Sequence, residues 1–516
     1  MSDTRATPPG GRRATHRSPR RRRLLPALLL GVLALGAWAG SGMADSPGDG
    51  APAGRPTSER PAEYSTALPF DLPSTAELRR SGKPVFAHYF TPYPLSLDNE
   101  PPQRDYYARN YLTADGEKGK HRAYGGLLRD RPLPAPREDG DWELAHLRQE
   151  VRTARDAGLD GFTLDLLSLS GRNRERAENL LRAATAEDPG FRVVLMPDMT
   201  SLDTTPEALA GELAELARHR SAHRLPDGRL VVSPFKAEAQ SPAWWRQALS
   251  ALEREHGIRT AFVPVFLDFD ANAERYAPIS HGLSEWGSRS YTTQSGSAAA
   301  TRTAHRLGKI WMQPVSVQDA RPNQGVYDEA GNTETLRASW GEAIDNGADW
   351  VQLTTWNDYS EGTHFAPSAH NGHTYLDLTS YYLTRFKTGS WPEIERDTLY
   401  LTSRVQFAAA LPPAGTQSKV IELRDGSAAP RDTVEVLSFL TAPATLRTFT
   451  GREKADHEAP AGVSARLLPL RTGTSGATAV RDGRTVTAVS SRYPVRDPIE
   501  KQDLQYYAVT SGRSQR

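Results

Sequence analysis

The sequence predicts an α/β protein, namely a (β/α)8 TIM barrel followed by a C-terminal all-β sandwich. Short apolar runs alternate with helix-like stretches up to about residue 392, and shorter alternating runs then continue to about residue 510. The chain has 516 residues, which is more than one hydrophobic core usually serves. We therefore expect two folded domains, a barrel over 80–392 and a sandwich over 396–510.

Eight apolar runs are expected to form the strands of the barrel. They cover residues 85–90, 161–167, 192–196, 230–235, 261–269, 282–286, 310–317 and 350–355. Strands that are buried on both faces and alternate with helices form parallel sheets. Eight such units over about 310 residues fit a closed barrel better than an open sheet.

The stretches between these runs carry apolar residues at spacings of three and four, which is typical of helices that cover a sheet. Several start after Asp, Asn, Ser or Thr and end at glycine, the usual capping residues. The expected helices cover 142–157, 173–185, 206–217, 242–256, 297–307 and 333–346. The long connection 91–140 is expected to be an elaborated first loop.

The pattern of apolar residues is different in the C-terminal part of the chain. Its alternating runs cover 398–402, 419–423, 433–439 and 485–489, separated by proline and Asp-Gly pairs. Short strands with frequent turns are typical of a β-sandwich. The sequences Arg424-Asp425-Gly426 and Arg481-Asp482-Gly483 are expected to be hairpin turns.

The N-terminus has the pattern of an export signal. Arg20–Arg23 precede the apolar run 24–38, which ends in Ala37-Trp38-Ala39, a small-x-small cleavage motif. The run of about 15 residues is shorter than the ~20 that span a bilayer. We predict a signal peptide over 1–39, a disordered linker over 40–70 and a secreted protein with no membrane attachment after cleavage. An uncleaved signal anchor is the alternative.

Composition excludes several classes of function. The 63 basic residues nearly balance the 62 acidic ones, and because many arginines lie in the leader, the remainder is mildly acidic. This argues against a nucleic-acid partner. The absence of cysteine excludes disulfides, thiolate metal sites and a cysteine nucleophile. No glycine-rich phosphate motif follows the first strand, so we predict no organic cofactor, and we expect a monomer.

The candidate site residues follow from the fold, because active sites of these barrels lie at the C-terminal ends of the strands. Carboxylates and aromatic rings gather at those positions, as a sugar site requires. The candidates are His88, Tyr89, Asp165, Asp198, Trp286, Trp356, Asn357, Asp358, Tyr359 and Glu361.

Asp358 and Glu361 are the candidate catalytic pair, since glycosidic cleavage needs one acid and one base or nucleophile. An extended strand end would place Trp356 on the same side as Asp358, where its ring would help to raise the carboxyl pKa. The other eight candidates are predicted to bind substrate. The competing interpretation of Asp358 is a helix N-cap.

A metal site is the main chemical alternative. His364, His370 and His373 follow the eighth run closely. Their spacing in a loop is loose, however, and the sequence has no His-Glu-x-x-His helix. A Gly-x-Ser-x-Gly nucleophile motif is also missing after the strands. We therefore predict no metal.

The segment Thr354–Glu361 resembles the eighth-strand signature of glycoside hydrolase family 71, the α-1,3-glucanases or mutanases. Ala157–Asp165 and Val85–Phe90 resemble the second-strand and first-strand segments of that family. The resemblance covers roughly residues 83–390. It implies an endo-acting hydrolase of the polysaccharide α-1,3-glucan that inverts the anomeric centre, with catalytic carboxylates at Asp358 and Glu361.

Three departures leave the exact glycan open. Asp165 stands where fungal members usually have asparagine, and Val317–Asp319 replaces the usual aromatics. Gly362-Thr363 resembles the endo-mannosidase family 99. An endo-α-mannosidase-like hydrolase is therefore one alternative, and a non-catalytic polysaccharide-binding wall protein is another. We assign Glu361 as general acid and Asp358 as base, although the residues alone also allow the exchanged roles.

Overall fold

The computed structural model describes residues 68–513. The predicted signal peptide over 1–39 lies outside the described residues, as does most of the predicted linker over 40–70. Within 68–513, no helix is both long enough and apolar enough to cross a bilayer.

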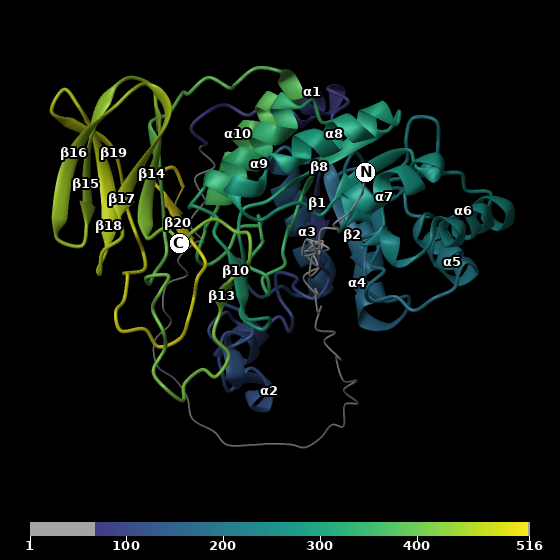
Figure 1. The fold of residues 1–516 in the computed structure, drawn as a ribbon, viewed down its shortest axis with the longest axis horizontal. Helices are drawn as coiled ribbons and strands as arrows, with labels where there is room; N and C mark the ends of the chain where they lie inside the picture. Colours follow the sequence, from purple (N-terminus) through teal and green to yellow (C-terminus); the bar gives the residue numbers. More distant parts are fainter. Residues whose placement is uncertain (1–67, 514–516) are drawn as a thin grey trace, which may run out of the picture. The chain divides into compact units, whose positions relative to one another are not determined.

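A parallel sheet forms the centre of the larger region (Figure 1). Its strands, in chain order, are β1 (Val85–Tyr89), β2 (Gly161–Leu166), β3 (Arg192–Pro197), β4 (Leu230–Val232), β5 (Thr260–Phe262), β6 (Val265–Phe266), β7 (Gly282–Glu285), β8 (Ile310–Val315) and β11 (Trp350–Leu353). Their spatial order is β5-β4-β3-β2-β1-β11-β8-β7-β6. Only two residues separate β5 from β6 in the chain, so the sheet closes on itself. The predicted barrel is confirmed.

The fifth predicted strand is shorter than expected and is divided. We predicted one run over 261–269, but Pro264 interrupts it because proline has no N–H to donate to the ladder. Pairing resumes at once, since the Val265 N–H donates to the Pro234 carbonyl at 3.0 Å. The rest of the run begins helix α7 (Phe269–Tyr276), where Asp268 accepts a hydrogen bond from the Ala271 N–H at 3.2 Å.

Helices cover the outside of the barrel as predicted (Figure 1). They are α3 (Trp142–Asp156), α4 (Gly171–Glu187), α5 (Pro206–Leu216), α6 (Pro242–His256), α7, α8 (Gly296–Arg306), α9 (Glu334–Asp345) and α10 (Thr374–Thr388), with α1 (Thr75–Arg80) preceding β1. The Ser241 hydroxyl caps α6, and Gly257 ends it with a φ of 70°, which glycine adopts without steric cost. Trp245 from α6 and Trp340 from α9 are buried in the same core as Trp311 from β8.

Two long connections elaborate the C-terminal ends of the strands. The first, between β1 and α3, contains a π-helix (Tyr107–Tyr111), α2 (Gly116–Gly119) and a 3-10 turn (Arg122–Tyr124). The second follows β8 and forms a hairpin of β9 (Asp319–Arg321) and β10 (Val326–Asp328). Further 3-10 turns cover Ala237–Ala239, Ala277–Ile279 and Tyr291–Thr293.

The C-terminal region is a sandwich of two antiparallel sheets. One has the order β17-β14-β12-β20 and the other β16-β15-β18-β19. The strands are β12 (Thr398–Ser403), β14 (Thr433–Leu440), β15 (Ala444–Thr450), β16 (Glu453–Ala459), β17 (Gly462–Pro469), β18 (Ser475–Arg481), β19 (Arg484–Ser490) and β20 (Tyr507–Thr510). Leu399 and Val436 from the first sheet share a buried cluster with Leu446 and Ala479 from the second.

One of the two predicted hairpin turns is confirmed. Asp482 and Gly483 join β18 to β19 with φ values of 52° and 75°, as the type I′ hairpin requires. The prediction for Arg424–Gly426 is wrong. The chain does turn there, since the Ser427 N–H donates to the Arg424 carbonyl at 3.1 Å. However, the preceding strand β13 (Glu422–Leu423) pairs in parallel with β10, so the turn does not form a hairpin.

Candidate active site

His88 and Asp165 lie together at the C-terminal ends of β1 and β2. The His88 Nε2 is 3.6 Å from the Asp165 Oδ2, and its Nδ1 is 3.1 Å from the Met196 sulfur. Burial lowers the pKa of His88 to about 4. Burial, reinforced by the charges of Asp198 and Asp358, raises the pKa of Asp165 well above its ordinary value. Burial thus favours the uncharged form of both groups, which form a polar lining.

Trp286 provides an aromatic wall beside this pair. Its ring contacts His88 edge-on at a centroid distance of 5.0 Å and Phe235 at 4.7 Å. The Arg289 guanidinium lies 5.3 Å from the Trp286 ring centroid. Arg289 also donates through Nη1 to the Ser316 hydroxyl. Its Nε lies 3.9 Å from the Asp319 Oδ2, and neither Nε nor Nη2 makes a hydrogen bond among the described residues.

Asp358 belongs to the loop that follows β11, which we call the catalytic loop (residues 354–363). Its Oδ1 accepts hydrogen bonds from the Ser360 N–H at 3.0 Å, the Ser360 hydroxyl at 2.6 Å and the Glu361 N–H at 3.3 Å. Burial nevertheless raises the pKa of Asp358 above that of an ordinary aspartate. Because these bonds fall on Oδ1, Oδ2 is the oxygen that can act on a substrate.

Glu361 lies in the same loop and has a different environment. Its Oε1 is 2.6 Å from the Arg321 Nη1, and the same arginine is held by Asp319 at 2.5–3.0 Å. Burial outweighs the attraction to Arg321, and the nearby charge of Asp358 adds to it, so the pKa of Glu361 rises to about 8. Near neutral pH, Glu361 is therefore mainly protonated.

The structure adds residues that sequence patterns did not indicate. Arg321 comes from β9, inside the loop that follows β8, and Arg289 follows the short strand β7. Tyr93 belongs to the first loop; burial and the charge of Asp358 raise its pKa well above the ordinary value. None of the three stands at the end of a strand of the barrel, so the strand-end signal in the sequence could not have identified them.

Tyr89 and Trp356 are not brought to the carboxylates. The Tyr89 hydroxyl donates to the Glu150 Oε2 at 2.8 Å, and the Trp356 Nε1 donates to the Glu150 Oε1 at 3.2 Å. Both rings also pack on Phe162, between the sheet and α3. The expectation that Trp356 shares a side with Asp358 is wrong, because β11 ends at Leu353 and strand alternation does not continue beyond it.

Asn357, Tyr359 and Asp198 have structural partners. The Asn357 amide binds the backbone of Phe90 and Tyr93, which fastens the end of β1. Tyr359 stacks on His364 at 4.3 Å inside a cluster of tyrosines. The Asp198 carboxylate accepts hydrogen bonds from Thr200 and Ser201, although its charge still reaches His88 and Asp165.

The three histidines of the metal alternative do not gather around a common point. His364 and His370 both contact Asp130, at 3.0 Å and 3.7 Å, whereas His373 precedes α10. In the described part of the chain, no group of three or more His, Asp, Glu or Cys side chains is arranged to hold a metal ion.

The C-terminal region reaches the catalytic loop. A Cβ added to Gly362 would lie 2.3 Å from the Gln505 Nε2, so this glycine lets the Gln505 side chain pack directly on the loop. The neighbouring Tyr506 N–H donates to the Gln318 Oε1 at 2.8 Å. The segment 502–507 thus supports the loop that carries both acids.

The comparisons of sequence point to one family. The family model of glycosyl hydrolase family 71 matches residues 137–515. A mutanase of Penicillium rubens is 24% identical over 71% of this chain and 85% of its own length. A glucan endo-1,3-alpha-glucosidase of Schizosaccharomyces pombe is 23% identical over 67% and 86%. A solved GH99 endo-alpha-mannosidase of Bacteroides thetaiotaomicron matches with a TM-score of 0.47 and 15% identity, covering 59% of this chain and 97% of that chain.

Proposed function

The chain belongs to glycosyl hydrolase family 71, and from that membership we propose that this glycoside hydrolase cleaves internal α-1,3 linkages of glucan. The names of its relatives support the linkage, since they are a mutanase and endo-1,3-α-glucanases. The observation that carries the proposal is the pair of buried carboxyl groups, Asp358 and Glu361, in one loop but in unequal environments.

The unequal environments assign the two roles. Glu361, whose pKa is raised to about 8, holds the proton that a general acid must donate. Asp358 has three hydrogen bonds on Oδ1 that stabilise its carboxylate, as a base requires. With exposed fractions of 8% and 9%, both residues are buried, although neither is completely closed off from solvent.

The reaction then proceeds by single displacement. Glu361 gives its proton to the glycosidic oxygen as the bond from C1 to that oxygen breaks. Asp358 takes a proton from a water molecule, whose oxygen forms the new bond to C1 from the opposite face. The products are two shorter chains, and the new reducing end has inverted configuration. Arg321 stabilises the carboxylate that Glu361 becomes.

The remaining residues of the site bind the sugar ring. Trp286 offers an aromatic face, while His88 and Asp165 offer hydrogen-bonding groups whose uncharged forms burial favours. The Arg289 Nη2, which makes no hydrogen bond among the described residues, is suited to donate one to a sugar hydroxyl. No organic cofactor enters this scheme.

The protein is proposed to act outside the cell, as a monomer. The support for export is the arginine-led apolar segment that ends at Ala39, which lies outside the described residues. An insoluble polysaccharide is a substrate that a cell must attack from outside.

The test is a screen of the purified protein against insoluble α-1,3-glucan, β-1,3-glucan, cellulose and α-mannan. We expect reducing sugars and a ladder of short oligosaccharides from α-1,3-glucan. Proton NMR at early times should show the β-anomer at new reducing ends. Product from α-mannan alone would contradict the proposed linkage, and binding without product would contradict catalysis.

A further inference from the structure

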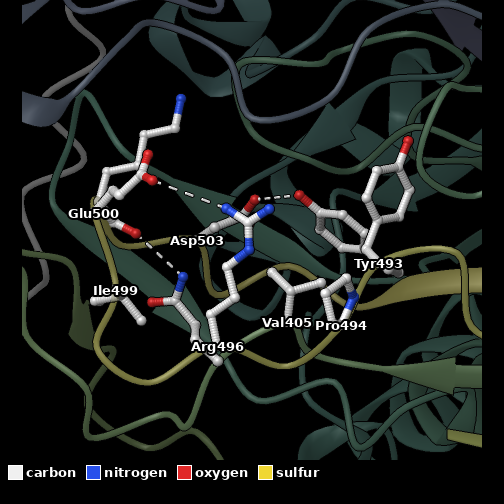
Figure 2. A pocket seen from close by; sticks show the side chains of 10 residues that line it. Val405, Tyr493, Pro494, Arg496, Ile499, Glu500 and Asp503 are labelled. Carbon is white, nitrogen blue, oxygen red and sulfur yellow. Dashed lines mark hydrogen bonds and ion pairs between the residues drawn. The ribbon is translucent and has the colours of Figure 1, made fainter. Parts of the chain in front are cut away.

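A second pocket lies in the C-terminal region, apart from the catalytic loop (Figure 2). Its volume is about 170 Å3, smaller than the ~300 Å3 at which pockets for drug-sized ligands begin. It is therefore suited to one sugar ring. The side chains that matter to the argument are Tyr493, Arg496, Glu500, Lys501, Asp503 and Tyr507.

The charges around the pocket cancel. Two cations, Arg496 and Lys501, face two carboxylates, Glu500 and Asp503. Figure 2 shows Arg496 extending toward Glu500, and these two groups are 4.0 Å apart with exposed fractions of 64% and 90%. Such loosely paired groups can exchange partners for ligand hydroxyls. A neutral, hydroxyl-rich ligand fits this balance better than an anion or a cation.

Two tyrosines provide the apolar part of the pocket. Tyr493 and Tyr507 meet edge-to-face at 5.1 Å and 83°. Tyr507 is fixed from behind, because its ring stacks on His370 at 4.0 Å. Rigid tyrosine rings combine an apolar surface with a polar hydroxyl at little cost in conformational entropy, which suits a sugar ring with its apolar C–H faces and polar rim.

The pocket is connected to the catalytic loop by a series of contacts. Tyr507 stacks on His370, His370 contacts Asp130, and Asp130 binds His364. His364 in turn stacks on Tyr359, which directly follows the proposed base in the sequence. The segment that lines the pocket also continues into the residues that pack on the catalytic loop.

We infer that this pocket is a secondary binding site for a neutral polysaccharide and holds one unit of a substrate chain while the catalytic loop acts on another. The identity of that chain as α-1,3-glucan rests on the proposed function. The binding itself does not, because it depends on the lining of the pocket and not on turnover.

Two substitutions test the pocket. Tyr493→Ala removes the ring and Arg496→Ala removes an exposed hydrogen-bonding group. Each should weaken binding to insoluble α-1,3-glucan by about tenfold, the scale of one well-formed contact. Turnover of a short soluble α-1,3-oligosaccharide should stay within about twofold, since such a substrate does not reach both sites.

Matched variants provide the controls. Tyr493→Phe keeps the ring and should retain binding. Arg466→Ala removes an exposed arginine from β17 that does not line the pocket, and it should retain binding as well. Arg496 is mostly exposed, so its substitution tests the pocket even if Tyr493→Ala impairs folding, which thermal melting would reveal.

The outcomes separate the two proposals. Binding to α-1,3-glucan that remains unchanged in both Tyr493→Ala and Arg496→Ala would overturn the secondary site, even if hydrolysis is confirmed. Wild-type protein that binds none of the glycans in the panel would overturn it as well. Binding that these variants weaken, without any soluble product, would support the pocket while the proposed function fails.

Discussion

Asp130 and Glu361 are both buried, and burial raises the pKa of each carboxyl group, yet their net pKa shifts have opposite directions. Asp130 is 0% exposed and accepts hydrogen bonds from His364, the His370 N–H and the Arg131 N–H. Its pKa falls to about 2, because these donors and the nearby histidines outweigh burial. Glu361 has one close cation, and its pKa rises to about 8. The histidines beside Asp130 thus distinguish it from Glu361, whose contact with Arg321 does not overcome burial.

The largest expected effect is on turnover. Glu361→Gln and Asp358→Asn should each lower kcat on α-1,3-glucan by about 100-fold or more, the scale of losing a general acid or base. Both substitutions keep the side-chain shape, so the melting temperature should show that the fold survives. Near-normal rates in both variants would contradict the assignment of Glu361 as the acid and Asp358 as the base.

Substitution of Asp130 should lower the stability of the fold and should not act on the chemical step. Asp130→Asn leaves buried donors without their charged acceptor and should lower the free energy of unfolding by about 2–4 kcal/mol, measured by urea denaturation at pH 7. The control is Asp71→Asn, whose partner Arg396 lies in an exposed ion pair; its loss should be a few tenths of a kcal/mol.

The loss of stability in Asp130→Asn is also predicted to depend on pH. Folding lowers the pKa of Asp130 from 3.8 to about 2. The contribution of Asp130 to the free energy of unfolding is therefore complete above the pKa of the unfolded state and disappears as the pH falls through the pKa of the folded state. The stability gap between wild type and Asp130→Asn should therefore narrow between about pH 4 and pH 2. A gap that stays constant over this range would contradict the charged state assigned to Asp130.

The pH–rate profile tests Glu361 directly. Because the acid must be protonated, kcat/KM should fall about tenfold per pH unit above a pKa near 8. On the acidic side, activity should begin to fall above the ordinary aspartate value of 3.8, because burial raises the pKa of Asp358. The residual activity of Glu361→Gln should lack the alkaline fall; a wild-type profile that is flat to pH 9 would exclude Glu361 as the acid.

Tyr93→Phe should have the smallest effect. The Tyr93 hydroxyl is buried near the charge of Asp358, so its removal should change kcat by about fivefold or less, the scale of one neutral hydrogen bond. Tyr106→Phe in the same loop is the matched control, because that hydroxyl binds Glu117 and should leave kcat unchanged. A 100-fold loss in Tyr93→Phe would mean that the phenol itself takes part in proton transfer.

The architecture could be predicted because its signals are local. The apolar runs at Val85–Tyr89 and Gly161–Leu166 and the capped helix at Pro242–His256 match the structure closely. The prediction of the fifth strand was wrong because the run over 261–269 contains both an interrupting proline and the start of a helix. Periodicity detects burial there, but it does not distinguish a buried strand from a buried helix end.

Residues of the site could be predicted only where chemically suitable side chains stand at or directly after the ends of the barrel strands. The structure brings His88, Asp165 and Trp286 together as expected, and Asp358 and Glu361 share a loop. Trp356 was misplaced because alternation was extended past the last strand residue. Arg321 and Gln505 could not be found in this way, since one comes from a hairpin inside a loop and the other from a region more than 140 residues away in the sequence.

The packing of Gln505 on Gly362 has a practical consequence for engineering. A β-sandwich joined by a free linker could be trimmed, exchanged or fused elsewhere as an independent module. Here the sandwich side of the chain completes the underside of the reactive loop, so truncation before residue 502 would cost the enzyme its catalytic geometry as well as an appendage. Chimaeras with relatives should therefore keep residues 68–513 together.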